Sequence, residues 1–113
     1  MRKPPSFLLP KFIGLLRELG YHFQGDQKRY NGQRYELVEF RHADGTKLYV
    51  EHFYLYGTGE LRGIKLMLGT QTKVVPGTYP ASFELVVVKS LLAEMGIDVV
   101  SRLRAKRLEA LLA

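Results

Sequence analysis

Four cations stand within six residues near the end of the chain, at Arg102, Arg104, Lys106 and Arg107. Arg and Lys side chains contact the phosphate groups of nucleic acids through charge and hydrogen bonds. On a helix, Arg102 and Lys106 share one surface, and Arg104 and Arg107 lie on a neighbouring strip. Such a helix suits a phosphate backbone, an acidic protein surface or bulk solvent, because a run of charge alone is non-specific.

A second basic group surrounds an aromatic residue in the first third of the chain. Lys28, Arg29 and Arg34 are close in sequence to Tyr30, in or just after a polar, turn-rich stretch over residues 25–32. Cations can meet phosphates there while the ring stacks on a base, which is the chemistry of a nucleic-acid contact loop. The alternative interpretation is a hairpin turn centred on the Asn-Gly pair at residues 31–32, with incidental charge.

The three histidines give no metal-binding pattern. His22, His42 and His52 are not spaced as His-x-x-x-His or His-Glu-x-x-His, so zinc hydrolase chemistry has no local support. The chain has no cysteine, which excludes disulfides and Cys-based zinc sites. We therefore predict no metal and no cofactor.

Two carboxylates are the remaining candidates for catalysis. We expect Glu36 and Glu51 to be diagonal neighbours on one sheet face, with Lys47 and His42 beyond them, and a Mg²⁺ nuclease needs such convergent carboxylates. Cross-strand ion pairing with Lys47 is the favoured interpretation. An enzyme that uses His42 or His52 with Glu36 or Glu51, including a small metal-dependent nuclease, is the least favoured hypothesis, and no catalytic residue is predicted.

Composition predicts one basic domain over residues 1–113. Seventeen Lys and Arg against eleven Asp and Glu give a net charge of +6, which favours polyanionic partners. Residues 31–60 carry three positive and five negative charges, a net −2, so both ends of the chain are the basic parts. An anion should therefore prefer the surfaces that the two ends build.

Three helices are expected. Pro10 and Gly20 bound a first helix over 10–19. Ser82 and Gly96 bound a second helix over 83–95. A strand over 83–88 is the competing prediction for the start of the second helix, because three valines are adjacent there. Asp98 caps a final helix over 99–112, whose apolar residues are predicted to form one broad stripe: Val99, Val100, Leu103, Leu108, Leu111 and Leu112.

Alternating apolar and polar residues predict an antiparallel sheet. Two runs, over 35–42 and 47–56, flank Asp44 and Gly45, a strong hairpin pair, and a third over 61–68 follows a turn over 57–60. Shorter strands are expected over 21–24 and 73–75. The fold class is therefore α+β: an antiparallel sheet of three to five strands, with one N-terminal and two C-terminal helices packed mainly on one face.

An unbulged hairpin across Asp44 and Gly45 divides the central side chains into two faces. The first face, expected to meet the helices, holds Tyr35, Leu37, Glu39 and Arg41 with Leu48, Val50, His52, Tyr54 and Tyr56. The second holds Glu36, Val38, Phe40 and His42 with Lys47, Tyr49, Glu51, Phe53 and Leu55. Tyr49 and Phe53 could expose rings on it, as RNA-binding sheets do, but a core role is favoured because Glu36 and Glu51 would repel phosphate.

The hypothesis that these observations favour is a small, non-enzymatic nucleic-acid-binding or regulatory protein of the kind that bacteria or their mobile elements encode. It requires the two basic groups to converge in space on DNA or RNA. The alternative is a protein-interaction module or homodimer built on the last helix, with Leu103, Leu108, Leu111 and Leu112 as anchors. The apolar run before Pro10 is too short for a signal peptide and no window suits a membrane span, so a cytoplasmic protein without a membrane partner is expected.

Overall fold

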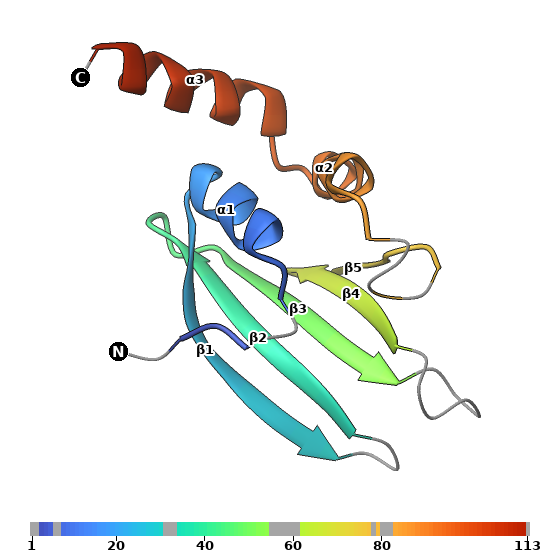
Figure 1. Cartoon of the computed structure of the whole chain (residues 1–113). Helices are drawn as coiled ribbons and strands as arrows, with labels where there is room; N and C mark the ends of the chain where they lie inside the picture. The colour runs from blue at the N-terminus through green and yellow to red at the C-terminus, as the bar shows by residue number, and fades with distance from the viewer. Residues whose placement is uncertain are drawn as a thin grey trace.

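The fold is α+β, with a five-stranded antiparallel sheet, one N-terminal helix and two C-terminal helices (Figure 1). The computed structural model describes residues 3–5, 8–30, 34–54, 62–77, 79 and 83–112, with the side chains of residues 29, 30, 34, 54 and 62 left out. Its elements follow in chain order: α1 (Pro10–Glu18), β1 (Tyr21–Tyr30), β2 (Arg34–His42), β3 (Lys47–Tyr54), β4 (Arg62–Leu68), β5 (Gln71–Val74), α2 (Leu85–Glu94) and α3 (Val99–Leu112).

The strands form a meander in the order β1-β2-β3-β4-β5, each antiparallel to the next. All three helices lie on the same side of this sheet: α1 and α2 cover its upper half in Figure 1, and α3 lies beyond them, farther from the strands. The ends of β1 and β2 that form their hairpin extend beyond the helices (Figure 1). The sheet therefore has a helix-covered face and an open face.

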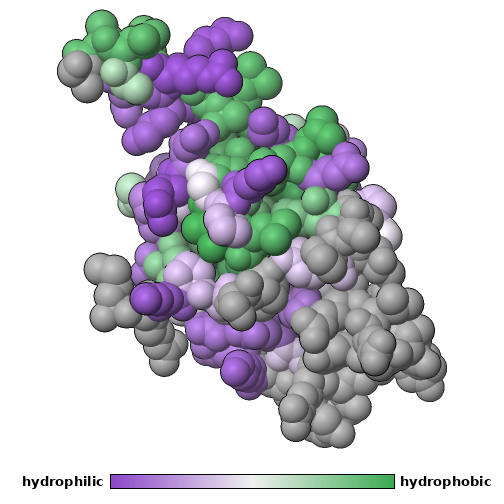
Figure 2. All heavy atoms as spheres, viewed as in Figure 1, coloured by the Kyte–Doolittle hydropathy of each residue, from purple (hydrophilic) through white to green (hydrophobic). Residues whose placement is uncertain are grey.

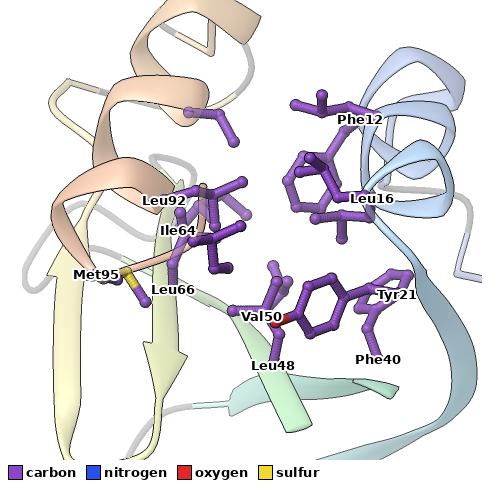
Figure 3. Close-up of a cluster of buried hydrophobic side chains, with 14 of the residues drawn as sticks. Phe12, Leu16, Tyr21, Phe40, Leu48, Val50, Ile64, Leu66, Leu92 and Met95 are labelled. Carbon is purple, nitrogen blue, oxygen red and sulfur yellow. The ribbon is translucent and has the colours of Figure 1, made fainter. Parts of the chain in front are cut away.

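The hydrophobic core fills the space between the helices and the covered face. Phe12 and Leu16 of α1 and Leu92 of α2 are fully buried against the sheet, and Phe12 meets Phe40 edge to face at 6.3 Å between ring centroids (Figure 3). The sheet side is also apolar and buried, with Val38, Phe40, Leu48, Val50, Ile64 and Leu66. This single-sided burial is why the strands alternate in sequence.

The first strand is longer than the sequence indicates. β1 runs from Tyr21 to Tyr30 rather than ending at residue 24, so most of the stretch expected to be a polar loop is paired with β2. A β-bulge makes this possible, because the register shifts between Phe23 and Gly25 and leaves Gln24 as an extra residue. The prediction of a loop over residues 25–32 is therefore wrong up to residue 30.

The predicted assignment of side chains to the two sheet faces is also wrong, and the hairpin loop is the reason. Arg41 pairs with Lys47, and the amide of His42 donates to the carbonyl of Thr46 at 2.9 Å, so the loop contains the three residues 43–45. Gly45 has φ +92°, the left-handed conformation that closes such a loop. One extra loop residue reverses the parity of pairing, so Val38 and Phe40 share a face with Val50 and Leu48.

The helices begin and end close to the predicted residues. α1 starts at Pro10 and is followed by Gly20, and the valines that suggested a strand lie in α2. The N-cap of α2 is Glu84 rather than Ser82, which lies outside the described residues, as do the turns predicted over 31–32 and 57–60. Among the described residues, no helix has both the length and the apolar character that crossing a membrane requires.

Candidate functional site

The structure does not bring the two basic groups together. Lys28 is exposed near the end of β1, and Arg29, Tyr30 and Arg34 occupy backbone positions at the tips of β1 and β2. This tip points away from α3, which lies at the opposite end of the molecule (Figure 1). The backbone positions of the two basic groups therefore lie at opposite ends of the part of the chain that the structure describes.

Arg102 holds α3 on the body of the protein. Its guanidinium donates to the carbonyl of Leu19 at 3.2 Å and lies 5.7 Å from the centroid of the Tyr21 ring. The carbonyl belongs to the residue that ends α1, where a cation also complements the helix dipole. Asp98 caps α3 as predicted, because its carboxylate accepts from the amide of Ser101 at 3.1 Å. Arg102 is thus part of the internal structure.

The second half of α3 projects from the body. Every residue from 104 to 112 is exposed, including Arg104, Lys106 and Arg107, and Lys106 lies 3.6 Å from Glu109 within the same helix. The apolar residues of α3 do not form one stripe. Val99 and Leu103 contact the core, whereas Leu108, Leu111 and Leu112 are 56%, 82% and 78% exposed. Figure 2 shows this apolar end beside hydrophilic side chains.

The carboxylate pair predicted for a metal site does not form. Glu36 lies on the covered face, and Glu51 lies on the open face with its carboxylate 3.5 Å from the ammonium of Lys65. For Glu51, the predicted pairing with Lys47 is therefore replaced by a pair with Lys65. Within the described ranges, no group of three or more His, Cys, Asp or Glu side chains could hold a metal ion.

Glu36 instead sits in a small polar group at the lower end of the covered face. It pairs in register with Lys28 on one side and with His52 on the other, and its carboxyl hydrogen-bonds with that of Asp26. Burial, together with this hydrogen bond and the charge of Asp26, raises the pKa of Glu36 to about 7. A carboxyl whose pKa is raised into the neutral range is the principal electrostatic feature of this group.

This pKa predicts a pH-dependent effect of Glu36→Gln. The folded pKa of about 7 lies above the ordinary 4.5, so the folded chain holds an extra proton between these values and the free energy of unfolding falls as pH rises through them. The glutamine of the variant does not titrate, so this fall in the free energy of unfolding does not occur in the variant. We expect its Tm, relative to the original chain, to rise by about 4 °C from pH 5 to pH 8, which corresponds to about 1 kcal/mol after solvent screening.

Thermal unfolding followed by circular dichroism at several pH values measures this difference. Glu18→Gln, at the exposed end of α1, is the control. A Tm difference between the Glu36 variant and the original chain that stays constant over the whole range contradicts the raised pKa.

The open face carries aromatic side chains that none of the helices in the described ranges covers. Tyr35 and Phe53 are directly opposite each other on β2 and β3, and Tyr49 is opposite Glu39 on the same two strands. All three rings are half-buried by their neighbours, in contrast to the fully buried apolar side chains of the covered face, such as Val38 and Val50. The structure therefore places rings where an unpaired base could stack.

Cations surround these rings. The ammonium of Lys65 lies 5.0 Å from the centroid of the Phe53 ring. The Phe53 ring can lie against β4 because residue 63 is a glycine, and a Cβ on that residue would come within 2.5 Å of the ring. Lys47 is exposed on the same face, and the guanidinium of Arg41 meets the carboxylate of Glu39 at 2.7 Å. The open face thus combines aromatic and basic groups with two carboxylates, those of Glu39 and Glu51.

No protein-family model, curated protein or solved structure matches this chain. Its function must be argued from its own geometry. Sequence reasoning identified Lys47, Tyr49 and Phe53 as a possible aromatic face but grouped them with Glu36, which the structure places on the other side. It did not identify Tyr35, Arg41 or Lys65 as part of that face, because the face depends on the length of the hairpin loop and on the pairing of β3 with β4.

Proposed function

We propose that this protein binds single-stranded nucleic acid on the open face of its sheet. The observation that carries the proposal is the row of rings formed by Tyr35, Tyr49 and Phe53 on a face without helices. Aromatic side chains stack on bases of any sequence, and each stacked base contributes roughly 1–3 kcal/mol of binding free energy. A protein of this kind needs no catalytic group.

The spacing of the rings suits separate bases. Tyr49 and Phe53 are four residues apart on β3, which corresponds to about 13 Å along a strand. Each ring can then receive a different base, and Tyr35 enlarges the platform beside Phe53. Unpaired bases are required, because stacked base pairs in a duplex do not present their faces.

Phosphate contacts on this face come from Lys47, Lys65 and Arg41. Lys65 and Arg41 are each paired with a carboxylate, so they keep their orientation but carry less net charge toward a ligand. Four of the cations predicted from the sequence, Arg102, Arg104, Lys106 and Arg107, lie on α3 instead. Arg104, Lys106 and Arg107 on α3 add to the long-range attraction of a polyanion without reaching the open face.

Fluorescence anisotropy with a labelled oligouridine or oligothymidine tests this function. We expect binding at low salt and a slope of log K against log salt of about −2, from three phosphates at about 0.7 each. A duplex of the same length should bind less tightly, since its bases are already stacked. Absence of binding at low salt, or tighter binding of the duplex, overturns the proposal.

A second candidate function concerns the projecting half of α3. Leu108, Leu111 and Leu112 are exposed together at the end of the helix, and exposed apolar groups of this kind mark protein interaction surfaces. The helix carries four cations and one carboxylate, a net +3, which opposes pairing with a second copy of itself. The favoured occupant is therefore an acidic, amphipathic segment of another protein.

An amphipathic peptide of Leu and Glu is the probe for this second function. We expect the peptide to bind the original chain and a Leu111→Ser variant to bind it at least tenfold more weakly, because the exposed leucine is lost. The same peptide with Lys in place of Glu should not bind. Equal binding of both peptides, or a dimer in light scattering, contradicts this assignment of the partner.

A further inference from the structure

A hollow of about 390 Å³ opens on the open face at the β-bulge of β1. Its lining includes Leu37, Glu39 and Arg41 of β2, together with Gly25 and Gln27 of β1 and Tyr49 of β3. This volume lies at the small end of the range typical for ligand sites. It is large enough for a single planar group and too small for a folded partner.

The bulge creates this hollow. Because Gln24 is an extra residue, Gly25 rather than a residue with a side chain lies opposite Glu39. On the other side of Glu39, β3 places Tyr49 directly opposite. The carboxylate of Glu39 therefore has a ring on one flank and a missing side chain on the other, which leaves space beside the carboxylate.

The polar groups at this position form a matched pair of acceptors and donors. The carboxylate of Glu39 and the guanidinium of Arg41 are 2.7 Å apart, with side-chain exposures of 24% and 44%. A carboxylate offers two acceptors and a guanidinium offers two parallel donors. A ligand that satisfies both needs two adjacent donors next to two adjacent acceptors.

Guanine is the base that presents two adjacent donors next to two adjacent acceptors. Its N1–H and N2–H groups lie side by side and can bind one carboxylate, and its O6 and N7 atoms can both accept from one arginine. Adenine, cytosine and uracil each lack either the pair of adjacent donors or the adjacent pair of acceptors beside it. The Tyr49 ring, at the edge of the hollow, can stack on a purine held in this way.

We propose that this hollow, formed at the bulge of β1, binds a guanine base through Glu39 and Arg41, with Tyr49 stacked on it. This inference rests on the proposed binding of single strands and adds a base preference to it. The rings of the open face tolerate any base, and the hollow adds a position where the base sequence is read.

An oligouridine in which one central position is U, G, A or C tests the preference by anisotropy. We expect the G-containing strand to bind about tenfold more tightly than the others. Glu39→Gln removes one acceptor and should abolish this advantage, so that the G-containing strand and the all-U strand bind this variant with equal affinity. Glu51→Gln is the matched control, since it neutralises a carboxylate on the same face outside the hollow and should keep the preference for G.

Gly25→Val provides a second variant that leaves the charge unchanged. Gly25 is not among the glycines with positive φ, so valine suits its backbone, and the new side chain should fill the hollow and remove the preference for G. If all four strands bind equally to the original chain, or if Glu39→Gln and Glu51→Gln behave alike, the hollow does not read guanine, although single-strand binding stands. If no strand binds at low salt, the proposed function itself fails.

Discussion

Replacing both Tyr49 and Phe53 by leucine is expected to weaken the binding of an all-U single strand by about 100-fold or more. Two stacking rings are lost, each contributing roughly 1–3 kcal/mol. Leucine keeps an apolar side chain of moderate size at these half-buried positions, so the packing of β3 on its neighbours should survive. Anisotropy at a fixed low salt concentration measures the loss.

The control for this double variant is Val74→Ala. Val74 is an apolar residue of the open face, 52% exposed on β5, and it has no ring to stack. We expect this variant to bind as the original chain does. Thermal unfolding of all three proteins establishes that they are folded under the conditions of the titration. Equal affinity of the double variant and the control would show that the rings do not contact bases.

Replacing Gly20 by alanine is expected to destabilise the fold by about 2–4 kcal/mol, since two separate costs fall on one position. Gly20 has φ +94° at the end of α1, a conformation that costs an L-residue about 1 kcal/mol or more. The added Cβ would also lie 2.7 Å from two atoms of the His42 ring. That ring cannot move freely, because it packs against Tyr21 and its Nδ1 accepts from the amide of Asp44.

Alanine variants of two other glycines separate the two contributions, and chemical denaturation measures the free energy of unfolding of each variant. Gly96 has φ +98° with open space around its Cβ position, so Gly96→Ala should lose only the conformational part, about 1 kcal/mol. Gly14 lies inside α1 with nothing near its Cβ position, so Gly14→Ala should stabilise the fold by up to about 1 kcal/mol. If Gly20→Ala costs no more than Gly96→Ala, the contact with His42 does not constrain the end of α1.

The candidate site was only partly predictable. Tyr49 and Phe53 were recognised as neighbours on one face from their spacing, because alternate residues of a strand always share a face. Whether that face meets the helices depends on which residues of β2 lie opposite them. The cations at Arg104, Lys106 and Arg107 were found as a run in the sequence, but the separate role of Arg102 depends on a carbonyl 83 residues away.

Local sequence alone determined the types and approximate limits of the elements. Pro10 and Gly20 bound α1, and alternation defined β2, β3 and β4, because backbone preferences and burial on one side act over a few residues. Only the tertiary structure decided which sheet face is open, where β1 bulges and which side of α3 is left without a contact. A single extra residue in the loop over 43–45 reverses which residues of β2 and β3 share a face, and the extra residue Gln24 shifts the pairing of β1 with β2. Such a residue is fixed by packing across the sheet rather than by its neighbours in sequence.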